Sequence, residues 1–166
     1  MITLKTVRWK NFLATGNNFI EVQLNNDPMT LVVGKNGAGK STLIDAITFS
    51  LFGKPFKRIN KGQLVNTINE KELVTEIEFS IGNVEWKIRR GIKPLLFEIY
   101  SNGKIVNQDA KSVDYQKYLE DKILKLNFKS FTQIVVLGSA SFVPFMQLSS
   151  NDRRIIIEDI LDIGIF

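Results

Sequence analysis

The chain has 166 residues, of which 44% are hydrophobic and 23% are charged, enough for about one domain with a packed core. It contains neither cysteine nor histidine, so disulfides, thiolate metal sites, histidine-based zinc sites and Ser-His-Asp triads are excluded for this chain. The formal net charge is +5, a mildly basic balance that is compatible with a nucleic-acid partner but does not by itself indicate one.

Three strands followed by a helix are predicted in the first third of the chain. Residues 2–9 alternate polar and apolar side chains, which indicates an edge strand, and residues 19–24 alternate again before a turn cluster. The continuous apolar run at residues 29–33 is typical of a strand buried on both faces. From Lys40 the apolar period becomes helical, and Gly53 ends the predicted helix. The side chains expected to point inward from the first strand are Ile2, Leu4, Val7 and Trp9.

Two hairpins are predicted in the middle of the chain. Gly82-Asn83 separates one pair of alternating segments, and Asn102-Gly103 separates a second pair. Glycine and asparagine tolerate the positive φ angles of tight hairpin turns. We therefore expect residues 73–106 to form a small antiparallel sheet.

Helices are predicted in the last third of the chain. Residues 112–126 carry a broad apolar stripe at helical spacing. A final helix is expected to open at Asn151, with Asp152 near its N-terminus. Residues 131–137 are apolar and ambiguous between helix and strand.

One motif carries specific chemistry. Residues 34–41 match the pattern G-x-x-x-x-G-K-[ST] in full, preceded by a predicted buried strand and followed by a predicted helix, as a phosphate-binding loop requires. Glycines in such a loop let successive N–H groups point at phosphate oxygens. Lys40 would carry positive charge to the β and γ phosphates, and the Ser41 hydroxyl would ligate Mg²⁺. The residues expected to contact the nucleotide are Gly34, Lys35, Asn36, Gly37, Ala38, Gly39, Lys40, Ser41 and Thr42, with Lys40 also serving catalysis.

The sequence around this loop resembles the heads of SMC-related ATPases. Lys10-Asn11-Phe12 and the segment 34–47 carry that resemblance. Residues 76–91 and 131–161 are similar to the SbcC-type branch, the ATPases of double-strand-break repair. The resemblance covers essentially the whole chain and implies ATP as the nucleotide, with roles in break processing and recombination. Further segments that look like the large subunit of tailed-phage recombination endonucleases are residues 51–56, 61–64 and 133–137.

The predicted fold class is α/β, and the resemblance implies a P-loop NTPase half-head of the ABC-ATPase type. Its mixed central sheet would be built around the strand at residues 29–33, with the helix of residues 40–52 packed on it and the antiparallel sheet beside it. Residues 1–166 are expected to be one N-terminal head lobe, with residues 150–166 entering a coiled coil.

The parts of a complete head that activate water are not found in the sequence. Residues 155–159 end in Glu158-Asp159, the reverse of the usual acidic pair, and suit a helix better than a buried strand. No L-S-G-G segment occurs either. We expect an N-terminal half-head (an engineered fragment, a split product or an early-terminated reading frame). Alone, it should bind nucleotide weakly and hydrolyse it very slowly.

A second Mg²⁺ ligand is implied by the resemblance. SbcC-type heads carry a lid-loop glutamine that reaches the metal, and counting back from Phe142 this chain has Ser139 at that position. Ser139 is therefore the candidate ligand, although serine is shorter than glutamine and lacks its amide. Gln133 and Gln147 lie nearby, but their spacing fits worse.

The partners implied by the resemblance are the C-terminal half of the same head, a second head in a homodimer, an SbcD-type nuclease and double-stranded DNA. Four cations directly after the first predicted helix are candidates for contacts with the DNA backbone, with a solvated loop as the alternative. A weaker candidate is the group at residues 87–90. The four cations are Lys54, Lys57, Arg58 and Lys61.

Two other functions stay open at the level of sequence. One is a different P-loop ATPase, of the transporter or recombination-mediator type. The other is a nucleotide- or DNA-binding module without catalysis. No stretch approaches the ~18 apolar residues of a membrane span, and residues 1–9 lack the apolar run of a signal peptide. We therefore expect a cytoplasmic protein with no membrane contact.

Overall fold

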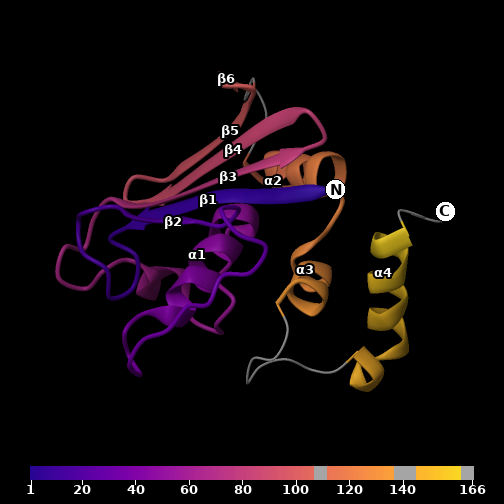
Figure 1. Ribbon diagram of the computed structural model, residues 1–166, viewed down its shortest axis with the longest axis horizontal. Helices are drawn as coiled ribbons and strands as arrows, with labels where there is room; N and C mark the ends of the chain where they lie inside the picture. Colours follow the sequence, from indigo (N-terminus) through magenta and orange to yellow (C-terminus); the bar gives the residue numbers. More distant parts are fainter. Residues whose placement is uncertain (107–111, 137–144, 162–166) are drawn as a thin grey trace. The chain divides into compact units, whose positions relative to one another are not determined.

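The computed structural model describes residues 1–106, 112–136 and 145–161 and divides the chain into two compact units (Figure 1). The first unit, Met1–Asn107, holds a β-sheet and the helix that follows the phosphate loop. The second unit, Gln108–Phe166, is helical in its described part. The single head lobe expected for residues 1–166 stays a prediction.

Six strands form one sheet in the described part of the first unit, and every pairing between them is antiparallel. They follow the spatial order β2-β1-β3-β4-β5-β6 (Figure 1). Their bounds are β1 (Ile2–Lys10), β2 (Ile20–Gln23), β3 (Leu73–Ile81), β4 (Val84–Ile92), β5 (Leu96–Ser101) and β6 (Lys104–Ile105).

The core of this unit lies on one face of the sheet. A row of completely buried aliphatic side chains crosses four strands, because Val7 pairs with Ile77, Ile77 with Ile88, and Ile88 with Ile99. Helix α1 (Lys40–Phe52) packs on the sheet against β1, β3 and β4. The predicted α/β architecture, with the helix after the phosphate loop packed on a sheet, is confirmed.

Both predicted hairpins form. Gly82 turns the chain from β3 into β4 with φ of 57°, and Asn102 and Gly103 turn it from β5 into β6 with φ of 48° and 77°. These are the left-handed angles that glycine and asparagine adopt most easily.

The alternation of residues 2–9 predicts an edge strand, and this prediction is wrong. Strand β1 lies between β2 and β3. A register shift against β3 between Leu4 and Thr6 explains why its inward side chains change phase along the strand. Beyond the shift, Val7 and Trp9 are buried as expected.

The predicted buried strand at residues 29–33, and with it the mixed central sheet, is wrong for the described chain. No strand forms there, and Met29, Leu31 and Val33 are 87%, 83% and 77% exposed. A strand buried on both faces needs neighbours that cover it. The described strands are instead paired with one another in the antiparallel sheet, so nothing covers this run.

The second unit is described as a series of helices. The predicted helix at residues 112–126 appears as α2 (Ser112–Tyr118) followed by a π-helical segment, η2 (Leu119–Leu124). The ambiguous segment at 131–137 is helical as far as Ile134, in α3 (Phe128–Ile134), which the Asn127 side chain caps by accepting from the Ser130 N–H. A short turn, η3 (Phe145–Gln147), precedes α4 (Ser150–Leu161), which confirms the last predicted helix.

Helices α3 and α4 pack together, and an ion pair between Lys129 and Asp152 joins them. The coiled coil expected from residue 150 onward stays a prediction. None of the described helices has the length and apolar character needed to cross a membrane.

Candidate nucleotide-binding site

The loop before α1 has the backbone that phosphate binding requires. Gly37 and Gly39 adopt φ of 86° and 87°, and the helix begins directly afterwards at Lys40. A side chain at either position would be strained. The turn is closed by two hydrogen bonds, from the Ala38 N–H to the Lys35 carbonyl at 3.1 Å and from the Thr42 N–H to the Gly39 carbonyl at 2.9 Å. The N–H groups of Lys40 and Ser41 come before Thr42 in the first turn of α1, where a helix supplies no partner, and they can serve an anion.

The Lys40 ammonium lies across this loop. Its Nζ donates to the main-chain carbonyl of Gly34 at 2.5 Å and to that of Lys35 at 2.8 Å. A hydrogen bond between ammonium and phosphate joins two charged groups and is stronger than one to a neutral carbonyl. Lys40 is thus placed to exchange its carbonyl partners for phosphate oxygens.

The hydroxyl proposed for magnesium is accessible, since Ser41 is exposed while the neighbouring Thr42 is buried. Mg²⁺ prefers oxygen ligands and keeps several waters, so a single hydroxyl beside nucleotide phosphates suits it. The second predicted ligand, Ser139, lies outside the described residues. Within the part of the chain that is described, no group of three or more acidic, histidine or cysteine side chains could hold a metal ion.

Sequence reasoning missed Asp45, which stands four residues after Ser41 on α1. Its side chain is completely buried. Oδ1 accepts the main-chain N–H of Lys57 at 2.9 Å, and Oδ2 lies 3.6 Å from the Lys57 Nζ. That distance is too long for a hydrogen bond, and Oδ2 has no hydrogen-bond partner among the described residues. The available signal was an acid within the apolar stripe of the helix.

Burial raises the pKa of the Asp45 carboxyl above its usual range, and the main-chain hydrogen bond and positive charge of Lys57 oppose part of that rise. The pair joins the helix of the phosphate loop to the basic segment that follows it.

The four cations of that basic segment, Lys54, Lys57, Arg58 and Lys61, are all exposed. The charge of Lys57 is matched by the buried Asp45 carboxylate, and 47% of the Lys57 side chain stays accessible. The DNA role of this segment stays a prediction.

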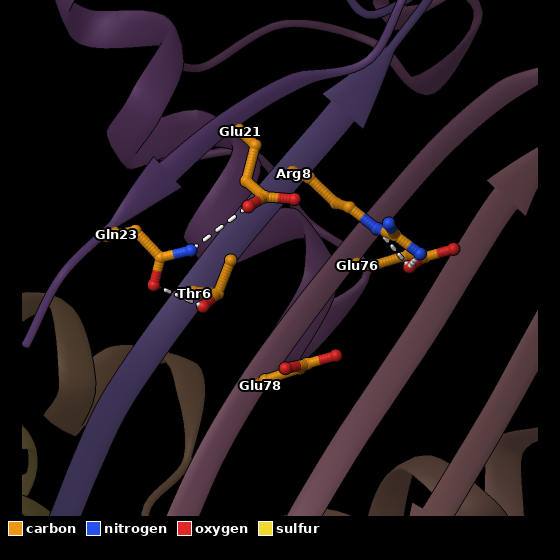
Figure 2. Close-up of a pocket in the computed structure, with 6 residues that line it drawn as sticks. All are labelled: Thr6, Arg8, Glu21, Gln23, Glu76 and Glu78. Atoms are coloured by element: carbon orange, nitrogen blue, oxygen red, sulfur yellow. Dashed lines mark hydrogen bonds and ion pairs between the residues drawn. The ribbon is translucent and has the colours of Figure 1, made fainter.

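The outer face of the sheet carries a separate polar network centred on Glu76 (Figure 2). The Glu76 carboxylate is 5% exposed and pairs with Arg8 at 2.5 Å, Arg89 at 3.0 Å and Lys87 at 3.4 Å. A hollow of about 120 Å³ lies beside it, where Gln23 donates to Glu21 at 3.0 Å. Lining residues of this hollow are Thr6, Arg8, Glu21, Gln23, Glu76 and Glu78.

The described cations of this network, Arg8, Lys87 and Arg89, are each paired with a carboxylate, so they do not offer the unmatched positive charge that a phosphate chain requires. Lys87 and Arg89 share it, whereas Arg90 lies on the opposite face of β4 and reaches α1. The weaker candidate group at residues 87–90 is thereby divided between the two faces of the sheet.

Comparison with known proteins bears on the phosphate loop and the fold together. Residues 6–163 match the protein family described as an AAA domain. The chain belongs to this AAA-domain family. It is 46% identical over 161 residues to exonuclease subunit 2 of Enterobacteria phage T4, an alignment that covers 97% of this chain and 29% of that protein. It is 32% identical over 133 residues to a probable DNA double-strand break repair Rad50 ATPase of Aquifex aeolicus, covering 76% of this chain and 13% of the relative.

The fold of this AAA-domain chain also resembles a chain solved in work on ATP-driven dimerization and DNA-stimulated activation of SMC ATPases. The TM-score is 0.62 at 21% identity, covering 95% of this chain and 99% of that one. The likeness shows that the chain has the fold of an SMC-type ATPase head. This chain spans about three tenths of the length of the phage exonuclease subunit. The predicted similarity to SbcC/Rad50-type repair ATPases and to a nuclease subunit of a tailed phage is confirmed, the phage relative being an exonuclease subunit.

Proposed function

We propose that the chain is the nucleotide-binding N-terminal part of an SbcC/Rad50-type ATPase that processes DNA double-strand breaks in the cytoplasm. The observation that carries this proposal is the loop at residues 34–39, with two left-handed glycines directly before α1 and the Lys40 ammonium drawn across it. The names of the repair relatives supply the biological setting.

The nucleotide would bind with its phosphates on the loop amides and on Lys40. Bound Mg²⁺ would supply charge neutralisation between the β and γ phosphates. Ser41 would hold the metal ion, and Ser139 stays proposed as a second ligand. The loop contacts proposed for the nucleotide are those of Gly34, Lys35, Asn36, Gly37, Ala38, Gly39, Lys40, Ser41 and Thr42.

The C-terminal half of the same head is the proposed partner of the apolar run at residues 29–33. The side chains of Met29, Leu31 and Val33 are each more than three-quarters exposed. The run that they belong to ends directly before Gly34, the first residue of the phosphate loop. Apolar side chains of the C-terminal half would cover these three side chains.

The remaining partners belong to the assembled protein. A second head would close over the nucleotide, and an SbcD-type nuclease would act on the DNA. The exposed cations Lys54, Lys57, Arg58 and Lys61 would contact the backbone of double-stranded DNA, with an affinity that falls as salt rises.

Titration of a fluorescent ATP analogue with Mg²⁺ into the purified protein tests the proposal. Native protein should bind, and Lys40→Ala should weaken binding by about tenfold or more, because a charge-assisted contact to phosphate is worth roughly 1.5–3 kcal/mol. Lys104→Ala, an exposed lysine on β6, is the matched control and should bind as the native protein does. Equal binding by native protein and Lys40→Ala would refute the proposed site.

A further inference from the structure

Asp45 presents an electrostatic problem for a site that binds phosphates. Its carboxylate is completely buried on α1, the helix whose N-terminus faces the nucleotide in the proposed function. Asp45 follows Ser41 by four residues, which places the two side chains on the same helix face with their Cβ atoms roughly 6 Å apart. A buried negative charge at that range repels a triphosphate, and the protein interior screens the repulsion far less than water does.

The structure also shows what opposes this charge. The Lys57 ammonium is 3.6 Å from Oδ2 of Asp45, and the Lys57 N–H donates to Oδ1. No other ion pair to this carboxylate is found among the described residues. The main-chain hydrogen bond fixes the loop, while the side chain supplies the compensating charge.

We propose that Lys57 supports nucleotide binding indirectly, by neutralising the buried Asp45 carboxylate that would otherwise repel the bound phosphates. The inference rests on the proposed nucleotide site and assigns Lys57 as a positioning and charge-balancing residue rather than a ligand of the nucleotide. It differs from a DNA role for the same ammonium, whose loss would weaken DNA binding and leave nucleotide affinity unchanged.

Three variants of the full-length protein that carries this chain separate these roles. Lys57→Met leaves the carboxylate without its counter-charge. Asp45→Asn removes the negative charge but keeps an oxygen that can accept the Lys57 N–H, so the loop stays attached. The double variant removes both charges. Each is titrated with the fluorescent ATP analogue and Mg²⁺, and folding is checked by circular dichroism.

We expect Asp45→Asn to restore the nucleotide affinity that Lys57→Met removes. Lys57→Met should weaken nucleotide binding by roughly tenfold, the order of magnitude given by one unit charge about 10 Å away at an effective dielectric constant near 20. Asp45→Asn should bind no more weakly than the native protein. In the double variant the affinity should return to within about twofold of native, because neither charge remains.

Other outcomes overturn the inference. A double variant as weak as Lys57→Met shows that Lys57 touches the nucleotide itself, and an unchanged Lys57→Met shows that its charge has no part in binding. Should Lys57→Met fail to fold, Asp45→Asn decides alone, because weaker binding in that variant contradicts a repulsive carboxylate. Arg58→Met is the control: any change that it causes in nucleotide affinity should be the same in the native protein and in the Asp45→Asn variant. A native protein that binds no nucleotide would instead overturn the proposed function.

Discussion

The Arg90 guanidinium of β4 donates from Nε to the main-chain carbonyl of Ser50 at 3.1 Å, joining a sheet strand to the C-terminal turn of α1 across 40 positions of sequence. Its Nη2 lies 3.5 Å from the Leu51 carbonyl, and its plane covers the Phe97 ring at 3.7 Å. The last carbonyls of a helix lack helical partners and carry negative partial charge, which a guanidinium satisfies. Arg90 therefore caps the helix whose other end forms the phosphate loop.

Replacing this cap should destabilise the first unit. Arg90→Met keeps much of the side-chain volume but leaves two carbonyls without their donor, so we expect the free energy of unfolding to fall by about 1–3 kcal/mol. Urea unfolding followed by circular dichroism measures the change. Lys104→Met, an exposed lysine on β6, should change stability by less than about 0.5 kcal/mol. Similar losses in both variants would contradict a capping role.

The close approach of Arg90 and a left-handed backbone angle both favour a glycine at position 53. A Cβ there would lie 2.9 Å from the Arg90 Nη1, and Gly53 has φ of 65°. Gly53→Ala should therefore cost more stability than Gly82→Ala, where φ is 57° but nothing lies within 4 Å of the added Cβ. In the Arg90→Met background the two glycine substitutions should cost about the same. If Gly53→Ala still costs more stability than Gly82→Ala in the Arg90→Met background, the added methyl group does not act through Arg90.

Local chemistry was predictable from the sequence. The phosphate loop depends on left-handed angles at Gly37 and Gly39 and on a lysine at the first helical position, all within six residues. The hairpin at Gly82 depends on the same local preference. Such features need no knowledge of what lies elsewhere in the chain.

Features set by distant neighbours were missed. The capping of Ser50 by Arg90 follows from the sheet register, and the pairing of Asp45 with Lys57 follows from the path of a loop. The composition of residues 29–33 predicts a buried strand, but composition does not supply the neighbouring strands. The central position of β1 was missed for the same reason.

Asp45 should make stability depend on pH in a direction opposite to that of most carboxylates. Burial raises its folded-state pKa above 3.8, so the native state holds the proton more tightly than the unfolded state does. As pH rises from about 4 toward the raised pKa, the native protein should lose stability relative to Asp45→Asn. Urea unfolding of both proteins across this range measures the difference.

Asp152→Asn provides the contrasting control for that experiment. The hydrogen bonds that Asp152 accepts from Lys129 and Ser149 lower its pKa. Its contribution is therefore present above the unfolded-state pKa and is lost as pH falls through the folded-state value. Relative to Asp152→Asn, the native protein should gain stability as pH rises. The difference in the free energy of unfolding between the native protein and Asp45→Asn should fall as pH rises. If it rises with pH, as expected for Asp152, burial does not raise the pKa of Asp45.

Residues 1–166 purified alone should hydrolyse ATP far below ~1 s⁻¹, a rate that complete enzymes commonly exceed. The chain offers a phosphate loop and Lys40, and the sequence provides no acidic pair of the usual order to orient water. A coupled phosphate-release assay measures the rate, and Lys40→Ala should lower what remains. Turnover near 1 s⁻¹ that is abolished in Lys40→Ala would show that the chain is catalytically complete.

The exposed apolar run at residues 29–33 should govern self-association of the isolated chain. Apolar side chains gathered in one exposed segment favour association, whereas single ones are common on surfaces. Joint replacement Leu31→Ser and Val33→Ser should reduce the apparent mass in light scattering toward that of a monomer. Leu95→Ser removes a side chain that is 85% exposed in the turn between β4 and β5, and it should leave the mass unchanged. If the double replacement has no effect, association arises from another surface, and the C-terminal half of the head loses its proposed docking segment.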